Sequence, residues 1–347
     1  MKILITGNMG YVGPAVTKQL RASFPDAVLI GFDIGYFARS ITNTNMLPEC
    51  KINIQHFGDM RQFPQDILQG VDAIVHLAAI SNDPIGNKFE DVTQDINYRA
   101  SIDLAKKAKE AGVTSFVFAS SCSMYGSADD SARTETSLLN PLTAYARSKV
   151  LTETDLSPLA SETFKISCLR FSTACGWSDR LRLDLVLNDF VAGAVASKKI
   201  TILSDGMPWR PLINIKDMAR AIDWAISRES ANGGNFLAVN VGSDEWNYQV
   251  KDLAQEVANV IAGTEISINK DAQPDNRSYR VNFDLFKVLA PFHQPKVSLT
   301  ESIKELYDGL ISVGFKDGEF RNSQYMRLNI LAELQEKALV NDKLQWI

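Results

Sequence analysis

Short apolar runs alternate with amphipathic stretches along most of the chain. Val12, Val16 and Leu20 recur every fourth residue, which is the spacing of one helix face. Six runs have strand character: Ile3–Ile5, Val28–Phe32, Ala73–Leu77, Phe116–Ala119, Ile166–Phe171 and Leu237–Val241. They are continuous rather than alternating in polarity, as in strands covered on both faces. The pattern predicts an α/β fold, with a doubly wound parallel sheet and helices on both faces.

The alternation weakens after about Phe171. Helix candidates Leu183–Ala196 and Val250–Ile261 then stand among scattered glycines, prolines and tryptophans. We read these pieces as a smaller, discontinuous second domain that closes over the carboxyl edge of the sheet. The expected division is a large α/β domain from 1–171 and 212–243, a smaller domain from 172–211 and 244–320, and a helical tail from 321–347.

Composition narrows the class of protein. The net charge of −5 argues against nonspecific binding to nucleic acid or to anionic membranes. Four cysteines without a C-x-x-C spacing and only three histidines argue against a zinc site. No apolar run reaches the roughly 18 residues of a membrane span, and the first residues read as a strand rather than a signal peptide. We therefore expect a cytoplasmic protein without a metal.

A glycine pattern follows the first strand. Gly7, Gly10 and Gly13 allow a tight turn and close approach of a pyrophosphate to a helix N-terminus. A glycine triplet alone also fits a simple turn, but here it lies between a strand and a helix. Asp33 ends the second strand, where a carboxylate accepts hydrogen bonds from ribose hydroxyls. Asp33 favours NAD over NADP, although the nearby Arg39 could soften that preference.

A tyrosine and a lysine stand four residues apart in the helical segment Leu142–Leu156. Tyr145 and Lys149 therefore share one helix face. A tyrosine with its ordinary pKa of about 10 is a poor base at neutral pH, and we expect the ammonium and an oxidised nicotinamide to lower that pKa. Ser121 follows the strand Phe116–Ala119, so its hydroxyl would meet Tyr145 at the carboxyl edge. In isolation such a pair is usually a solvated helix face, whereas beside the glycine pattern it indicates carbinol oxidation.

In these motifs the chain resembles the extended short-chain dehydrogenase/reductase superfamily, in particular its NAD-dependent nucleotide-sugar epimerases and dehydratases. The motifs are TGNMGYVG at 6–13, Gly58-Asp59, HLAA at 76–79, NYRAS at 97–101, SSCSMYG at 120–126, YARSK at 145–149 and RPLINIKDMA at 210–219. The resemblance implies a Rossmann-like fold and the catalytic residues Ser121, Tyr145 and Lys149. It implies cofactor contacts from Gly7, Gly10, Tyr11, Val12, Asp33, Asp59, Met60, Leu77, Ala78, Ala79, Asn97, Tyr145 and Lys149.

Two departures from the family pattern bear on the reaction. Ala146 replaces a glycine that many relatives carry after the tyrosine, a change that a helix tolerates. The 4,6-dehydratases carry an Asp-Glu pair after the catalytic hydroxyl, and this chain has Cys122-Ser123 there. Elimination of water needs an acid and a base beyond the tyrosine, so the sequence disfavours a dehydratase.

Two arginines indicate the substrate class. Arg210, before a predicted strand Leu212–Ile215, resembles the family arginine that binds the substrate diphosphate, and Arg277 resembles a second one. Either could instead form a structural ion pair, Arg210 for example with Asp217. The remaining expected substrate contacts are Ser81, Ser123, Thr173 and Asn188. Asp83, just after the HLAA motif, is also expected to face the sugar, with a simple loop role as the alternative.

Together the motifs predict NAD-dependent oxidation of a hydroxyl on a nucleoside-diphosphate sugar, with a transient ketosugar. Epimerisation is the first reading, and a nucleotide-sugar dehydrogenase or reductase is the second. A regulator that senses the cofactor is a third reading, but such proteins often lose the tyrosine or the lysine. The segment RLRLDLVLNDFVAGA at 180–194 resembles a branch that modifies sugars for bacterial surface polysaccharides. The resemblance also implies a homodimer.

Overall fold

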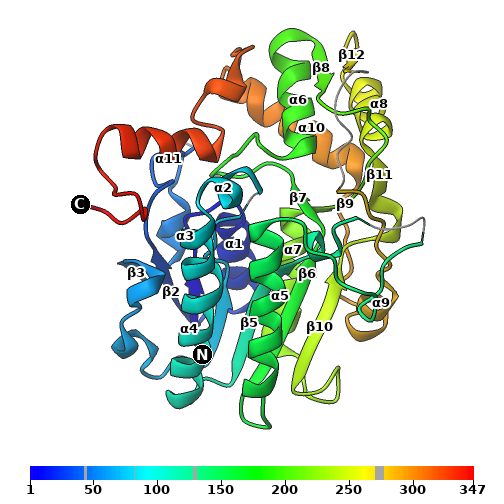
Figure 1. Ribbon diagram of the computed structural model, residues 1–347. Coiled ribbons are helices and arrows are strands. Elements are labelled where there is room, and N and C mark those ends of the chain that lie inside the picture. Colours follow the sequence, from blue (N-terminus) through cyan, green and yellow to red (C-terminus); the bar gives the residue numbers. More distant parts are fainter. Residues whose placement is uncertain (43–44, 82, 128–130, 270–276) are drawn as a thin grey trace.

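The computed structural model describes residues 1–42, 45–81, 83–127, 131–269 and 277–347. Within them, seven parallel strands form the main sheet in the order β10-β6-β5-β4-β1-β2-β3 (Figure 1). The strands are β1 Lys2–Thr6, β2 Val28–Asp33, β3 Ile54–Phe57, β4 Ala73–His76, β5 Ser115–Ser121, β6 Lys165–Phe171 and β10 Phe236–Val241. The predicted α/β fold with a doubly wound parallel sheet is confirmed.

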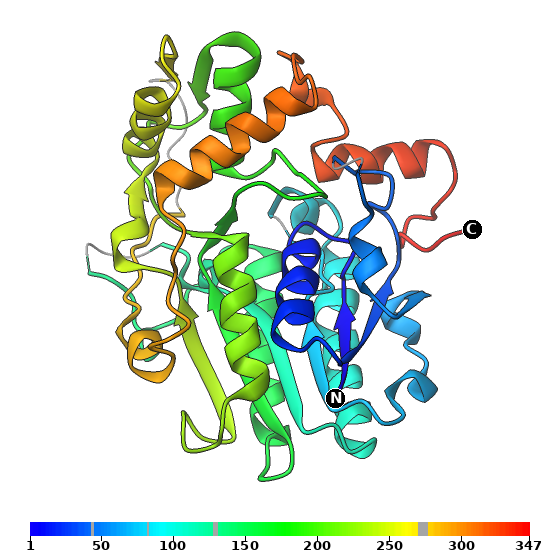
Figure 2. The ribbon, with the colours of Figure 1, turned by 180° about the vertical axis from the view of Figure 1, so that it is seen from behind.

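Helices cover both faces of this sheet because successive strand residues point to opposite sides. Ile3 and Ile5 of β1 pack with Val16 on one face, whereas Leu4 packs with Leu104 on the other. The first face carries α1 (Gly13–Ser23) and α7 (Ile215–Ser227), in front in Figure 2. The second carries α4 (Ala100–Glu110) and α5 (Ala144–Leu156), in front in Figure 1. Short helical segments, α2 (Asp83–Lys88), α3 (Glu90–Gln94) and a π-helical turn (Asp95–Arg99), lead into α4.

Smaller elements gather beyond the carboxyl edge of the sheet, at the top of Figure 1. Strands β7 (Thr173–Cys175), β9 (Trp209–Asn214) and β11 (Asn247–Gln249) form one small sheet, and β8 (Lys199–Ile202) pairs with β12 (Glu265–Ile268). The helices there are α6 (Val186–Ser197), α8 (Val250–Val260) and α10 (Leu299–Ser312), and α9 (Asp284–Leu289) lies beside β10.

The smaller elements share one hydrophobic core with the main sheet. A single cluster of buried side chains contains Ile3 and Val239 of the sheet together with Leu187, Leu253 and Leu306 of α6, α8 and α10. The main sheet and the smaller elements beyond its carboxyl edge are therefore packed continuously. This packing fixes the distance between the two walls of any site formed between them.

The C-terminal segment is helical over a shorter range than its leucine spacing predicts. Only α11 (Arg327–Glu336) is an α-helix, so the expectation of a helical tail from 321 to 347 is wrong beyond residue 336. Ala338 and Leu344 adopt φ angles of 50° and 53°, which a right-handed helix does not contain. The leucine spacing instead reflects burial, because Leu331, Leu334 and Leu344 pack against the Rossmann-like domain. In the described part of the chain, no helix is both long and apolar enough to cross a membrane.

Candidate active site

A cleft of about 850 Å³ runs along the carboxyl edge of the main sheet. Its floor is built from the ends of β1, β2, β4 and β5, and its opposite wall from the segment between β7 and α6. In open α/β sheets this edge is where ligands bind, because the strand order reverses there and leaves a crevice. The lining includes the expected glycine turn at one end and the expected tyrosine and lysine at the other.

The glycine turn fits the pyrophosphate of a dinucleotide. Gly7 has a φ angle of 73°, and a Cβ there would lie 2.6 Å from the backbone nitrogen of Ala78. A Cβ on Gly13 would lie 2.0 Å from the carbonyl oxygen of Asn8. Side chains are therefore excluded where β1 enters α1, and the free N–H groups of the helix remain open to an anion. NAD bound in this cradle accepts and returns the hydride in the chemistry of such sites.

Two carboxylates stand where the adenosine half of the cofactor is expected. Asp33 accepts hydrogen bonds from the backbone nitrogens of Met9 (3.0 Å) and Gly35 (2.8 Å), and burial nevertheless raises its pKa. Asp59 is held by the guanidinium of Arg61, whose Nε lies 2.9 Å from Oδ1. Asp59 also caps the short helix Met60–Gln62. Both acids line the cleft in fixed orientations, ready to accept hydroxyl or amino donors.

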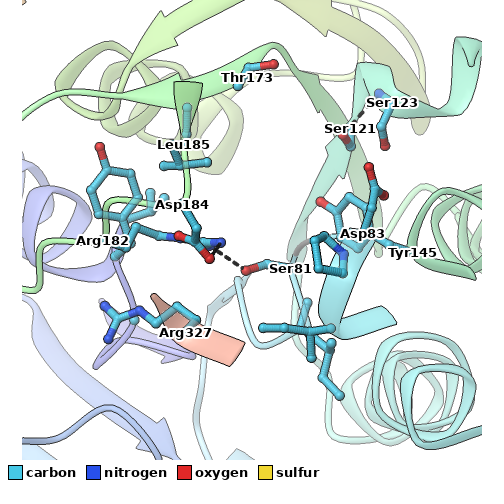
Figure 3. Close-up of a pocket in the computed structure, with 18 of the residues that line it drawn as sticks. Ser81, Asp83, Ser121, Ser123, Tyr145, Thr173, Arg182, Asp184, Leu185 and Arg327 are labelled. Atoms are coloured by element: carbon cyan, nitrogen blue, oxygen red, sulfur yellow. Dashed lines mark hydrogen bonds and ion pairs between the residues drawn. The ribbon is translucent and has the colours of Figure 1, made fainter. Parts of the chain in front are cut away.

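Tyr145 and Lys149 lie on α5, which begins because the Thr143 side chain caps it at Ala146 N (3.1 Å). Lys149 is 3% exposed, and its Nζ donates to Ala119 O (2.6 Å) and lies 5.5 Å from the centroid of the Tyr145 ring. Ser121 ends β5 and lines the same cleft, and its hydroxyl is near enough to the Tyr145 phenol to act on the pKa of that phenol. The three predicted catalytic residues therefore meet at one end of the cleft (Figure 3).

The protonation behaviour of this group differs from the expectation drawn from the sequence. Burial raises the pKa of Tyr145 to about 12, while the hydrogen bond with Ser121 acts in the opposite direction. Burial also lowers the pKa of Lys149 to about 7, against the nearby carboxylate of Glu153. The protein alone thus does not lower the pKa of the tyrosine, because desolvation exceeds the opposing effects of Ser121 and Arg182. Any lowering has to come from the charge of the oxidised cofactor.

The opposite wall of the cleft carries a buried ion pair. Arg182 grips Asp184 through Nε (2.5 Å) and Nη2 (2.8 Å), and its Nη1 donates to the Ser81 hydroxyl (2.9 Å). Burial acts to raise the pKa of Asp184, but the guanidinium lowers it overall, so the acid stays ionised. Figure 3 shows this pair facing Tyr145 and Ser121 across the open space, with Thr173 between them at the top. A substrate carbinol would be enclosed between these walls.

The two arginines expected to bind a diphosphate lie at the mouth of the cleft. Arg210 is inside β9, not before it as predicted, and its guanidinium donates to Trp209 O (2.9 Å) and to Arg277 O. Arg277 forms an ion pair with Asp83, whose other oxygen accepts from the Thr143 hydroxyl (2.6 Å). The pair joins the substrate side to the start of α2. Both arginines line the cleft.

Two predicted contact residues do not line the cleft. Asn97 is 1% exposed, and its amide bonds the backbone of Ile80 on both sides, at 2.7 and 2.9 Å. Asn188 is fully buried and bonds Gly176 N, Arg182 O and the Tyr11 hydroxyl at 2.9 to 3.0 Å. Their amides are occupied within the chain, so both act as supports of the site. The sequence motifs placed them correctly near it but could not show which way they point.

The other expected site residues all line the cleft: Gly7, Gly10, Tyr11, Val12, Asp33, Asp59, Met60, Leu77, Ala78, Ala79, Ser81, Ser121, Ser123, Tyr145, Lys149, Thr173, Arg210 and Arg277. Asp83, which follows the HLAA motif closely and was expected near the sugar, lines it as well. Sequence reasoning did not assign a site role to Tyr279 or Arg327, which also line it. Arg327 lies more than 300 residues from the glycine turn, and no motif marks it.

The features of this cleft are those of α/β enzymes that use a nicotinamide dinucleotide to oxidise a carbinol. The sequence profile of the NAD dependent epimerase/dehydratase family matches residues 3–242, and the chain belongs to that family. It is therefore an enzyme of the NAD-dependent nucleotide-sugar epimerases and dehydratases, and its cofactor is NAD, as the sequence predicted.

Curated relatives and solved structures are similar over most of the chain. An uncharacterized UDP-glucose epimerase of Bacillus subtilis, YtcB, is 32% identical over 254 residues, which cover 71% of this chain and 78% of that protein. A dTDP-glucose 4,6-dehydratase of Streptomyces griseus is 25% identical over 286 residues, 81% of this chain and 85% of that protein. The structure of UDP-glucuronic acid 4-epimerase from Bacillus cereus with UDP-glucuronic acid and NAD has a TM-score of 0.76 at 22% identity, covering 90% of this chain and 100% of that one. It shares the fold.

Proposed function

We propose that this enzyme epimerises a hydroxyl-bearing carbon of a nucleoside-diphosphate sugar, in the synthesis of sugars for surface polysaccharides. The observation that carries the proposal is that Ser121 and Tyr145 line one side of the cleft, beside the buried Lys149 and facing the Arg182–Asp184 wall. A carbinol between these walls has a proton acceptor on one side and a fixed polar surface on the other.

The side chains have separate parts in the proposed reaction. Tyr145 removes the hydroxyl proton while hydride leaves the same carbon, and a ketosugar results. Ser121 donates to the carbonyl oxygen as it forms. Lys149 lies below the tyrosine ring and holds a cation near the forming phenolate when it is protonated. Return of hydride to the other face of the ketone gives the epimer, so the cleft must let the sugar turn while the nucleotide stays bound.

Epimerisation is favoured over dehydration by the residues beside Ser121. Cys122 is 1% exposed, its thiol donates to Arg170 O at 3.1 Å, and burial raises its pKa, so it points away from the cleft and stays protonated. Ser123 lines the cleft but has no carboxyl group. Away from the adenosine end, the acids that line the cleft are Asp83, Asp184 and Asp189, and they are bound in ion pairs with Arg277, Arg182 and Arg321. Water elimination therefore lacks an available acid and base.

A diphosphate-linked substrate fits the mouth of the cleft. Arg210 and Arg277 both line the cleft, and planar guanidinium groups bind phosphate through paired hydrogen bonds. The curated relatives carry UDP-glucose or dTDP-glucose in their names, so UDP- and dTDP-hexoses are the first substrates to offer. The proposal places the sugar toward Tyr145 and the diphosphate toward Arg210.

The test is to incubate the purified enzyme with UDP-, dTDP-, GDP- and CDP-hexoses and to analyse the products by chromatography and mass spectrometry. We expect one of them to convert into an isomer of equal mass, without accumulation of the reduced-nicotinamide absorbance. Tyr145→Phe should lower the turnover about 100- to 10,000-fold, since it removes the proton acceptor. Tyr307→Phe, on α10 and away from the cleft lining, is the matched control and should keep full activity.

Other products would each contradict epimerisation in a recognisable way. A product lighter by one water would show a dehydratase. Stoichiometric accumulation of reduced nicotinamide would show a dehydrogenase. Full turnover by Tyr145→Phe would remove the tyrosine from the mechanism altogether.

A further inference from the structure

Arg327, the first residue of α11, is a buried cation that the reaction above does not use. It is 2% exposed and nevertheless lines the cleft. Its Nη2 donates to Arg180 O (2.8 Å), and its guanidinium lies 4.4 Å from the centroid of the Phe37 ring. Among the described residues, Nη1 has no hydrogen-bond partner. A buried guanidinium in the lining of the cleft therefore keeps one donor without a partner among the described residues.

The charges around Arg327 do not neutralise it. Arg180 pairs with Glu49 (2.8 Å), and Arg182 is gripped by Asp184, so the two neighbouring guanidinium groups have carboxylates of their own. Burial together with these two cations lowers the pKa of Arg327 to about 9. A buried cation without its own carboxylate costs several kcal/mol of folding free energy. Such a cost is sustained where a ligand supplies the missing anion.

The position of Arg327 indicates which ligand anion would neutralise it. Phe37 follows β2 and Asp33, and Asp33 is among the groups whose charge acts on Arg327. Arg327 thus lies toward the adenosine end of the cleft, and Figure 3 shows it on the side away from Ser121 and Tyr145. Arg210 and Arg277 are placed at the mouth for the sugar nucleotide. The glycine turn at 7–13 contains no lysine or arginine, so its N–H groups alone face the cofactor diphosphate.

The segment that carries Arg327 is fastened to the same end of the cleft. Leu331 and Leu344 pack in one cluster with Tyr36 of the loop after β2. Arg61, which also grips Asp59, donates to Lys343 O (2.7 Å), and the Trp346 indole donates to Ile34 O (2.8 Å). Residues 327–347 therefore cross over the loops that receive the adenosine, as the red segment in Figure 1 shows.

We propose that Arg327 binds the diphosphate of NAD, and that the segment 327–347 completes the cofactor site from the far end of the chain. The guanidinium supplies the cation that the glycine turn lacks, and the anion accepts the hydrogen bond that Nη1 does not make within the described residues. An epimerase returns the hydride that it has taken, so it gains from holding one cofactor through both half-reactions. The segment contributes to that hold by covering the adenosine end.

The test measures binding, so its outcome is independent of the reaction catalysed. The affinities of the cofactor-free enzyme for NAD, ADP, adenosine and UDP are measured by calorimetry for the wild type, Arg327→Met and Arg327→Lys. We expect Arg327→Met to weaken NAD and ADP about 10- to 100-fold, since a charged hydrogen bond to phosphate is lost. Adenosine and UDP should bind unchanged. Arg327→Lys, which keeps the charge, should recover most of the ADP affinity.

The matched control is Arg39→Met. Arg39 is an exposed arginine that pairs with Glu333 on the same helix but does not line the cleft, so ADP binding should not change. Unchanged NAD and ADP affinities in Arg327→Met would overturn the proposal and leave Arg327 a structural residue. A loss of UDP affinity with NAD unaffected would overturn it as well, by assigning the arginine to the substrate. Should Arg327→Met fail to fold, equal losses of ADP and adenosine in Arg327→Lys would contradict a diphosphate contact.

Discussion

Lys149 shows how a single residue can oppose stability for the sake of the site. The ammonium is buried beside Tyr145, and burial lowers its pKa to about 7, below the value of about 10.4 in an unfolded chain. The unfolded state therefore binds this proton more tightly. The cost of burying the charge is fully present below about pH 7 and disappears as the pH rises toward about 10.

Replacement of Lys149 should therefore change the pH dependence of stability in a defined direction. Lys149→Met carries no charge to bury, so its free energy of unfolding relative to the wild type should be most favourable near about pH 6 and less so near about pH 10. Urea unfolding of the cofactor-free proteins at both pH values measures this. Lys106→Met, an exposed lysine on α4, should show no such trend. A difference independent of pH would mean that Lys149 is not a buried cation in the folded protein.

At the scale of single residues, the sequence predicted which residues lie near the site better than it predicted the orientation of their side chains. Ser121, Tyr145 and Lys149 were placed together because strand ends and helix faces have fixed periodicities. Asn97 and Asn188 were expected to contact ligands, but their amides bond the backbone inside the chain. Amide rotamers depend on the packed surroundings, which a single sequence does not display.

Among the elements, the turn between β1 and α1 has the strictest local requirement. Gly7 combines a positive φ angle with a close approach of the neighbouring strand end, since a Cβ on this residue would lie 2.6 Å from Ala78 N. Gly112 has a similar φ angle of 79°, but no atom lies within 4 Å of the same position. Substitution of Gly112 therefore introduces backbone strain alone. Substitution of Gly7 introduces the same strain together with a collision at the strand end that lines the cofactor site.

Gly7→Ala and Gly112→Ala form a matched pair. Both should lose about 1 to 2 kcal/mol of stability from the left-handed conformation. Gly7→Ala should in addition weaken NAD binding about 100-fold or more, because the turn must move by a large fraction of an ångström to relieve the contact. Calorimetric NAD titration and urea unfolding measure the two effects. Equal NAD affinity in both variants would show that the turn is not the pyrophosphate cradle.

Among the strands of the main sheet, the sequence predicted those whose two faces are both covered. Six of the seven strands in the described main sheet coincide with the apolar runs. The missing one, β3 (Ile54–Phe57), is a short edge strand whose residues are all partly or fully exposed, so it has no apolar run to detect. The tail was expected to be helical throughout because buried leucines at near-helical spacing look alike in a helix and in an irregular segment packed on a surface.

For the molecule as a whole, the glycine turn and the substrate-side wall are joined by one buried amide. Tyr11 lies within the turn, and its hydroxyl donates to Gly176 O (2.6 Å) and accepts from Asn188 Nδ2 (2.9 Å). Asn188 also holds Arg182 O (3.0 Å), just before the ion pair with Asp184. The cofactor cradle and the wall opposite Tyr145 are thus positioned relative to each other through α6.

Asn188→Ala should release both sides at once. Three buried hydrogen bonds are lost, so we expect a destabilisation of about 2 to 4 kcal/mol in urea unfolding. The NAD affinity should also fall, because Tyr11 and the Arg182 wall lose their common support. Asn259→Ala, an exposed asparagine on α8, should change neither. The resemblance to the family instead implied that Asn188 contacts the substrate, and that role predicts the opposite pattern: unchanged stability and NAD affinity, with KM for the sugar nucleotide raised. Measuring all three quantities on one variant decides whether Asn188 contacts the substrate or links the two parts of the site. Only a structural link would lower the stability of the protein and its affinity for NAD together.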